Sequence, residues 1–347
     1  MAPPARPPRA KLLAAFLAVY LIWGSTFLAI RYAIETIPPF LMAGMRFLAS
    51  GAVLYGWARW RGAAPPTRRH WASAAVIGAL LLLTGNGLVV WAEQRVPSGV
   101  ASLFIATEPM WIVLLDWLSG HGARPPRRVA AGVGMGLVGV GLLADPGDLV
   151  GGGAVDPLGA GVLLVAAFSW AVGSLYSRRA HLPPAPLLAT AMQLLAGGVL
   201  LVAAAAATGE LAAFAPHAVS ARSLGALLYL AVFGSLVGYT AYIWLLRVEP
   251  PARVATYAYV NPVVAVLLGW LVAREPLGPR TIAAASVIIG AVAMITLRPR
   301  GPRAGVSPPA SAPEPGIPPS PSGRRTAPPA APSTSPASRT PSGSPAA

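Results

Sequence analysis

Residues Pro251 to Glu275 read PARVATYAYVNPVVAVLLGWLVARE, a long apolar run with a proline near its middle. An earlier stretch, PSGVASLFIATEPMWIVLLDWL from Pro97 to Leu118, has the same design. The two starting prolines are 154 residues apart, and the two internal prolines, Pro109 and Pro262, are 153 apart. This correspondence indicates an internal duplication, in which the chain contains two copies of one structural unit.

The same offset recurs upstream of both stretches. Trp23 precedes Trp170 by 147 residues, and Gly51 precedes Gly198 by 147 residues. Because the offset is sustained along the chain, we interpret it as an internal duplication rather than as isolated chance matches.

The composition is typical of a protein built for lipid. The chain has 347 residues, of which 55% are apolar and only 11% are charged, and its mean hydropathy is +0.62. A soluble domain normally carries roughly a quarter charged residues. We therefore expect an all-α integral membrane protein.

The residue inventory excludes several kinds of chemistry. The chain has no Cys, which rules out disulfides, thiolate metal sites and iron–sulfur clusters. Lys11 is the single lysine, so the interior of the chain holds no phosphate-binding loop of the GxxxxGK[ST] type. The four His residues are far apart and near predicted loops. We expect no cofactor, no metal site and no enzymatic activity.

Ten apolar runs approach or reach the length of about 20 residues that a helix needs to cross a bilayer. Because backbone in lipid must satisfy its own hydrogen bonds, each run is predicted to be a helix. The Pro-rich, basic residues 1–10 precede the first run, which we interpret as an uncleaved span. The runs cover residues 11–31, 38–58, 71–92, 98–118, 127–144, 158–177, 185–207, 223–246, 254–273 and 281–297.

Basic residues set the expected orientation. With the N-terminus in the cytoplasm, twenty of the 26 basic residues fall on the cytoplasmic side and five on the other, while Arg46 lies inside a span. This bias follows the positive-inside rule and predicts that both termini are cytoplasmic in a multi-pass protein of the cell (inner) membrane. It also accounts for the net charge of +15 without a nucleic-acid partner, which would need basic residues gathered on one folded face.

Each half contains five expected spans, which is an odd number, so the second half enters the membrane from the opposite side. This predicts ten transmembrane helices as two inverted five-helix repeats, residues 11–144 and 158–297, joined by an extracytoplasmic linker at 145–157. Residues 1–10 and 298–347 are rich in Pro and basic residues, and the second of these segments is also rich in Ser. Both are expected to be disordered.

Six blocks along the chain carry a resemblance to a known family. On these blocks, residues 11–297 resemble an EamA-type transporter of the drug/metabolite transporter (DMT) superfamily, close to its YedA-like exporters. The blocks are IWGSTFLAIR (22–31), PPFLMAGMRFLASG (38–51), TGNGLVVWAEQRVPSGVAS (84–102), SWAVGSLYSRR (169–179), FGSLVGYTAYIWLLR (233–247) and ATYAYVNPVVAVLLGWLVAREPL (255–277).

The resemblance implies a secondary transporter of small organic metabolites or drugs, such as amino acids, that works without ATP. It also implies a central cavity lined by the first, third, fourth, sixth, eighth and ninth helices, with the fifth and tenth helices at the periphery.

Arg46 is the first candidate for a functional polar group, because a charged side chain in mid-membrane costs about 2.5–3.5 kcal/mol. Its counterpart in the second repeat is Gln193, by the match of FLASG with LLAGG. The guanidinium offers a planar fork of donors that suits a substrate carboxylate. The alternative is a structural arginine bonded to a helix-end carbonyl or a neighbouring Glu.

Glu108 is the second candidate. It directly precedes Pro109, which removes a backbone hydrogen bond in mid-span and makes the site kinked and locally polar. A buried carboxyl group there can carry a proton, as proton-coupled antiport requires. Its counterpart, Asn261, is polar but cannot titrate. The alternative pairs Glu108 with Arg46 or with hydroxyl groups as a fixed lock.

Aromatic and small polar side chains are expected to complete the cavity, since Tyr and Trp offer both π-faces and polar tips. Each is also a candidate for ordinary packing. We further expect Glu93 and Arg95 to form a surface ion pair and Glu275 to play a structural role. The cavity candidates are Trp23, Trp91, Trp170, Tyr239, Tyr242, Tyr257 and Tyr259, with Ser25, Thr26, Asn86, Thr256 and Asn261.

The expected function is secondary transport, with export preferred, by alternating access around a cavity at the membrane midplane. The expected partners are a small-molecule substrate and the lipid bilayer. The coupling is left open between proton exchange through Glu108 and the substrate gradient, and a homodimer is also left open. A second class, a polytopic membrane enzyme acting on a lipid-linked or small hydrophobic substrate, would need clustered Asp, His or Arg at one interface.

Overall fold

The computed structural model describes residues 8–119, 127–143, 155–275 and 277–296, and every regular element among them is helical. Seven helices in these ranges are long and apolar enough to cross a membrane. They are Arg9–Ala33, Pro39–Trp60, Arg68–Ala92, Ser98–Leu118, Pro157–Ser177, Pro186–Ala207 and Ala221–Val248. The protein is therefore a multi-pass membrane protein.

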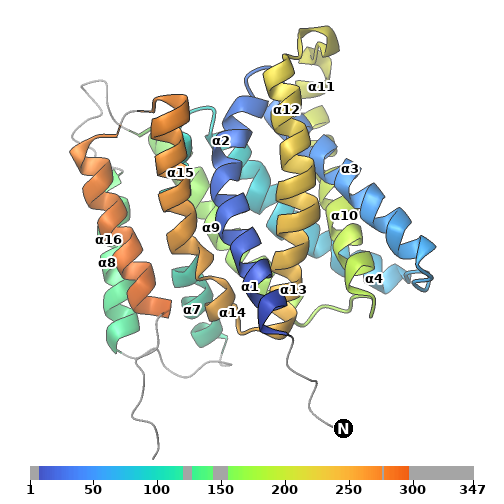
Figure 1. Ribbon diagram of the computed structural model, residues 1–347, viewed down its shortest axis with the longest axis horizontal. Helices are drawn as coiled ribbons and strands as arrows, with labels where there is room; N and C mark the ends of the chain where they lie inside the picture. The colour runs from blue at the N-terminus through green and yellow to red at the C-terminus, as the bar shows by residue number, and fades with distance from the viewer. Residues whose placement is uncertain (1–7, 120–126, 144–154, 276, 297–347) are drawn as a thin grey trace, which may run out of the picture. The chain divides into compact units, whose positions relative to one another are not determined.

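Most of the helices are labelled in Figure 1; they subdivide these spans, and three further helices stand at the remaining apolar runs. Helix was expected at each of the ten apolar runs and is present at each, while the ten-span inverted-repeat topology stays a prediction. The labels are α1 (Arg9–Leu17), α2 (Trp23–Ala33), α3 (Pro39–Trp60), α4 (Arg68–Ile77), α5 (Leu88–Ala92), α6 (Ser98–Ile105), α7 (Glu108–Leu118), α8 (Arg127–Leu143), α9 (Pro157–Ser177), α10 (Pro186–Ala207), α11 (Glu210–Ala213), α12 (Ala221–Tyr229), α13 (Thr240–Val248), α14 (Pro251–Val254), α15 (Tyr257–Ala273) and α16 (Pro279–Thr296).

Three spans contain a π-helical segment in mid-length, at Ala18–Ile22, Gly78–Gly87 and Leu230–Tyr239. Two other spans are interrupted by a single turn, at residues 106–107 and 255–256. At these two turns a threonine hydroxyl donates to the carbonyl three residues earlier, Thr107 to Phe104 and Thr256 to Arg253, each at 2.7 Å, beside the backbone hydrogen bond between the same residues. The backbone in the middle of the bundle is therefore irregular. Such π-bulges and broken helices are frequent at functional sites.

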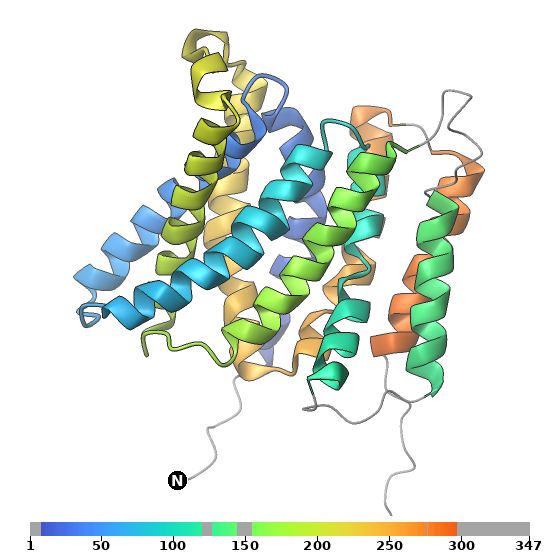
Figure 2. The ribbon, with the colours of Figure 1, turned by 180° about the vertical axis from the view of Figure 1, so that it is seen from behind.

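Helices from the two halves of the chain pack against one another in pairs. Helix α3 packs on α10, α8 packs on α16, and α6 packs on α15. Figures 1 and 2 place α8 and α16 at one edge of the bundle and α3, α4 and α10 at the opposite edge, with α2, α9 and α15 between them.

The crossing of α3 and α10 depends on two glycines 147 residues apart. A Cβ on Gly51 would lie 2.9 Å from the backbone nitrogen of Leu195, and one on Gly198 would lie 2.9 Å from that of Leu48. Leu48 and Leu195 are themselves 147 residues apart. The two halves of the chain therefore make the same close backbone contact at corresponding positions.

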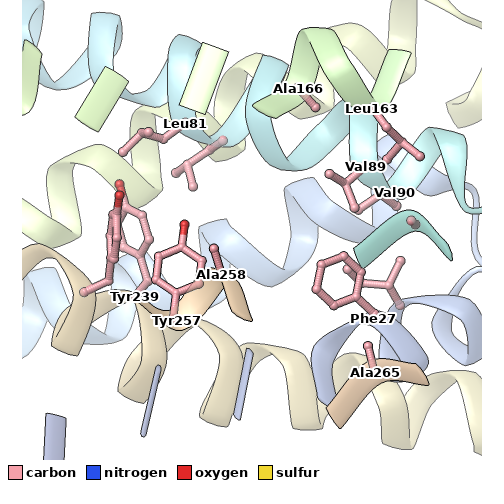
Figure 3. Close-up of a cluster of buried hydrophobic side chains, with 14 of the residues drawn as sticks. Phe27, Leu81, Val89, Val90, Leu163, Ala166, Tyr239, Tyr257, Ala258 and Ala265 are labelled. Carbon is pink, nitrogen blue, oxygen red and sulfur yellow. The ribbon is translucent and has the colours of Figure 1, made fainter. Parts of the chain in front are cut away.

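The core lies between the central helices. Figure 3 shows Phe27 of α2, Val89 of α5 and Leu163 of α9 on one side of the buried cluster, with Tyr239 and Tyr257 on another. The hydroxyl groups of the two tyrosines bring polar atoms into an otherwise apolar interior.

Candidate functional site

A cavity lies among the central helices and takes lining residues from both halves of the chain. Its empty space amounts to about 640 Å³, including its mouth. The lining comes from α2, α5, α6, α9 and α15, from the π-helical segments Gly78–Gly87 and Leu230–Tyr239, and also from α3. The second span therefore contributes to the wall in addition to the six spans implied by the family resemblance.

Aromatic rings form one wall of the cavity. Trp23 and Trp170, the repeat-related tryptophans, meet edge to face with ring centroids 5.6 Å apart. Tyr257 meets Trp23 in the same way at 5.4 Å. The Trp23 indole nitrogen donates to the Gly234 carbonyl at 3.1 Å, within a π-helical segment. Such rings suit a flat or apolar solute.

Tyr242 lies behind this wall. Its hydroxyl accepts a hydrogen bond from the Trp170 indole nitrogen at 3.0 Å and shares one with the Ser174 hydroxyl at 2.6 Å. Its ring packs against Trp23 and Tyr257. Tyr242 therefore orients the lining aromatic side chains without lining the cavity itself.

Arg46 brings a cation to the cavity. Its side chain is 4% exposed, its Nε donates to the Ser235 hydroxyl at 2.8 Å, and its Nη1 has no hydrogen-bond partner in the described protein. Gly234 lies beside it, since a Cβ there would lie 3.4 Å from Nη2. The guanidinium is thus fixed through one nitrogen and keeps another available, in an environment where an unpaired charge is costly.

Two amide side chains add acceptors to the same lining. The Oδ1 atoms of Asn86 and Asn261 are buried and have no hydrogen-bond partner among the described residues. An unpaired buried polar atom costs about 1–3 kcal/mol, so three such groups around one cavity point to an occupant that pairs with them.

Glu108 lies next to the cavity rather than in its wall. It is 1% exposed and accepts a hydrogen bond from the Tyr257 hydroxyl at Oε2, while Oε1 has no partner in the described protein. It begins α7 after the turn at 106–107, as its place before Pro109 predicted. Its counterpart Asn261 lies inside α15, because the corresponding break comes earlier, at 255–256. Tyr257, rather than Arg46, is its partner.

The cavity gathers eight of the predicted residues: Trp23, Thr26, Arg46, Asn86, Trp170, Tyr239, Tyr257 and Asn261. Three others lie elsewhere. Ser25 bonds to the Tyr229 hydroxyl at 2.6 Å, Thr256 bonds to that of Tyr20 at 2.5 Å, and Trp91 lies under Arg95 near the end of its span. The side chain of Tyr259 lies outside the described residues.

Sequence reasoning missed the apolar part of the lining and one polar support. Phe27, Ile30 and Ala166 line the cavity, but nothing distinguishes them in sequence from lipid-facing residues. Ser235, which holds Arg46, stands in the glycine-flanked stretch FGSLVGY, and that pattern was the available signal.

The predicted surface pair of Glu93 and Arg95 is wrong. Arg95 instead pairs with Asp156, with Nη1 and Oδ2 3.5 Å apart, whereas Glu93 is only 4% exposed. Neither carboxylate oxygen of Glu93 has a hydrogen-bond partner in the described protein. Helix α5 ends at Ala92, and the turn after it directs the side chain of Glu93 inward and that of Arg95 outward.

The family model and the YedA relative identify a transporter family. A model of the EamA-like transporter family matches residues 10–144 and 157–297. The chain is 42% identical over 287 residues to the uncharacterized inner membrane transporter YedA of Escherichia coli K12, which covers 82% of this chain and 90% of that one. It is 26% identical over 276 residues to protein PecM of Dickeya dadantii, covering 79% and 88%. Among solved structures, a crystal structure at 22% identity is similar in fold, with a TM-score of 0.59 and coverage of 83% of this chain and 97% of that one.

Proposed function

The chain belongs to the EamA-like transporter family, and we propose that it carries small organic molecules with a carboxylate group across the membrane. Amino acids and related metabolites or acidic drugs are the proposed class. We propose export as the direction, on the resemblance to the exporters of the family. The protein acts as a secondary transporter in the cell (inner) membrane.

The observation that carries this proposal is the available guanidinium of Arg46 in an aromatic cavity. A carboxylate placed beside Nη1 accepts a charge-assisted hydrogen bond that the protein itself does not provide. The Trp23, Trp170 and Tyr257 rings accommodate an apolar body, and the Asn86 and Asn261 oxygens accept hydrogen bonds from an amino or hydroxyl group. An α-amino acid has these three features.

Alternating access is the proposed mechanism. The matching contacts of Gly51 and Gly198, and the meeting of Trp23 with Trp170 across the cavity, support two structurally equivalent halves. When such halves are inverted relative to one another, rocking one against the other opens the site to each side in turn.

Proton exchange is the proposed driving force. Glu108 reaches the cavity through the Tyr257 hydroxyl, so a change in its protonation alters the hydrogen bonding of a lining residue. Inward proton movement then accompanies outward solute movement. The substrate gradient alone is the competing driving force.

Transport by purified protein in proteoliposomes tests the proposal with matched acids and amides, for example indole-3-acetate and indole-3-acetamide, beside an amino-acid panel. Wild-type protein is expected to move the acids, and Arg46→Gln to lose about tenfold or more in apparent affinity for them, because a hydrogen bond to a charged group contributes about 1.5–3 kcal/mol. Arg59→Gln, which removes an exposed charge, is the control. Absence of flux for every solute, or equal losses for acid and amide, would contradict the proposal.

A further inference from the structure

A second pocket lies at the end of the bundle where α1 begins, which we call the N-terminal end (bottom of Figure 1). It opens where α9 and α13 end and α10 begins, and its empty space is about 780 Å³ including its mouth. Ser177, Arg178 and Arg247 lie in its wall, and Gln193 lines it as well. None of these residues lines the central cavity.

The wall of this pocket carries positive charge. Arg178 and Arg247 are both exposed, and neither forms an ion pair with an acidic side chain in the described part of the chain. Glu249, two residues beyond Arg247, is engaged with Arg253 at 2.8 Å. Two uncompensated guanidinium groups at a concave mouth raise the local concentration of anions.

Gln193 adds a buried donor to the same pocket. The residue is 0% exposed, its Oε1 accepts the Tyr239 hydroxyl at 2.9 Å, and its Nε2 has no hydrogen-bond partner among the described residues. An unpaired buried N–H group calls for an acceptor, and an anionic oxygen is one that the two arginines attract.

The Tyr239–Gln193 hydrogen bond joins one lining residue of each space. Tyr239 lines the central cavity, in which Arg46 presents its available nitrogen, whereas Gln193 lines the second pocket. Gln193 is the residue of the second repeat that corresponds to Arg46 in sequence. Each space therefore holds a donor for an anionic group, Arg46 in the central cavity and Gln193 in the second pocket, and the Tyr239–Gln193 hydrogen bond lies between them.

We propose that the second pocket is an entrance site, which binds the acid group of the transported solute before the Tyr239–Gln193 hydrogen bond opens and admits it to the central cavity. This inference rests on the proposed transport function. The ligand class is an anionic oxygen group, a carboxylate on a small organic body. A phosphate of an anionic lipid has the same chemistry and is the competing source.

The test uses the absence of Cys from the chain, so that a single introduced thiol reports on one place. Ser177→Cys in neutral phosphatidylcholine nanodiscs is treated with a sulfonate-bearing methanethiosulfonate or with a trimethylammonium-bearing one. The modification rate of Ser177→Cys with the anionic reagent is expected to be about ten times its rate with the cationic reagent. Arg178→Gln with Arg247→Gln is expected to abolish that preference, while Arg59→Gln with Arg61→Gln, the same change in net charge outside the pocket, keeps it.

Two further arms identify the occupant. Indole-3-acetate is expected to slow modification of Ser177→Cys, and indole-3-acetamide is not. If phosphatidylglycerol in the nanodisc blocks the thiol and indole-3-acetate has no effect, the pocket holds a lipid headgroup and the inference is wrong. Equal rates for the two reagents also overturn it. These readouts need no transport, so a protein that binds at this pocket but moves no solute would contradict the proposed function alone.

The barrier is tested with Ala166→Cys, whose side chain lines the central cavity. Tyr239→Phe and, independently, Gln193→Met remove the Tyr239–Gln193 hydrogen bond and are expected to speed the modification of that thiol several-fold. Tyr176→Phe is the matched control, because it removes the hydroxyl of an exposed tyrosine at the end of α9 that borders the second pocket. Unchanged rates in both variants would show that this hydrogen bond is not a barrier.

Discussion

At the scale of single residues, Glu275 joins the ends of three helices. It follows α15 and accepts hydrogen bonds from the backbone nitrogens of Ser98 and Gly99, at 3.0 and 3.1 Å, and from the Ser98 hydroxyl at 2.8 Å. Arg31 of α2 pairs with the same carboxylate at 3.3 Å. The negative charge also sits at the N-terminus of α6, which the helix dipole favours. This geometry agrees with the structural role expected for Glu275.

We predict that Glu275→Ala lowers the free energy of unfolding by about 2–3 kcal/mol, because it leaves buried N–H groups of α6 without an acceptor. Glu275→Gln keeps an acceptor but loses the charge and is expected to cost less. Thermal unfolding in detergent, followed by tryptophan fluorescence, measures both. Glu249→Ala, which removes a carboxylate paired with Arg253 within one turn, is the control and is expected to cost under about 1 kcal/mol. Equal shifts for Glu275→Ala and Glu249→Ala would contradict this account.

Glu108 gives the second prediction at this scale. If the protonation of Glu108 couples to the cavity through Tyr257, uptake driven by an imposed pH gradient is expected in wild-type proteoliposomes and lost in Glu108→Gln. Exchange of solute at equal pH on both sides is expected to persist in the variant, because Arg46 and the aromatic wall are untouched. Flux that ignores the gradient equally in both proteins would leave the substrate gradient as the driving force.

Sequence reasoning singled out polar groups that the structure brings together around the cavity, while their part in binding stays a prediction. Arg46, Asn86 and Asn261 are polar residues within apolar runs, and all three line the cavity. It failed for Glu93 and Arg95, since the direction of a side chain after a helix end depends on local turn geometry that hydropathy does not encode. The pairing of Glu108 with Tyr257 spans 149 residues and likewise required the fold.

At the scale of helices, apolar run length predicted the elements well because a span must bury a nearly continuous stretch of side chains in lipid. Residues 98–118 were expected as one run, and α6 and α7 occupy that range with one turn between them. The π-helical segments were not predicted. Some of their carbonyls accept hydrogen bonds from distant side chains, Gly234 from the Trp23 indole and Leu80 from the Ser169 hydroxyl, and such contacts leave no local pattern.

The α3–α10 crossing yields a prediction for a pair of glycines on one helix. Gly51→Ala is expected to destabilise the protein by about 1–3 kcal/mol, because its Cβ would meet the backbone nitrogen of Leu195 at 2.9 Å. Gly56→Ala, five residues along α3, meets nothing within 4 Å and is expected to be neutral or to stabilise by up to about 1 kcal/mol. Unfolding midpoints in detergent compare the two. A tolerated Gly51→Ala would mean that the helices can separate at no cost.

At the scale of the whole molecule, the distribution of basic residues and the odd number of spans per repeat make one connected prediction about topology. The turn between α3 and α4, with Arg59, Arg61, Arg68 and Arg69 in it or beside it, lies at the N-terminal end, whereas α11 and the short 3-10 helix Pro216–Ala218 lie at the opposite end (Figure 1). The positive-inside rule then puts the N-terminal end in the cytoplasm.

Single thiols test this topology directly, because the natural chain contains none. Ala64→Cys, at an exposed position between α3 and α4, is expected to resist a membrane-impermeant maleimide on intact cells and to react after lysis. Ala218→Cys, exposed at the opposite end, is expected to react on intact cells. The reverse pattern would show that the protein has the opposite orientation in the membrane. The entrance site would then face away from the cytoplasm, and import would replace export as the proposed direction. Reaction of both thiols on intact cells would contradict the bundle as a membrane-spanning unit, because the two positions would then share one side.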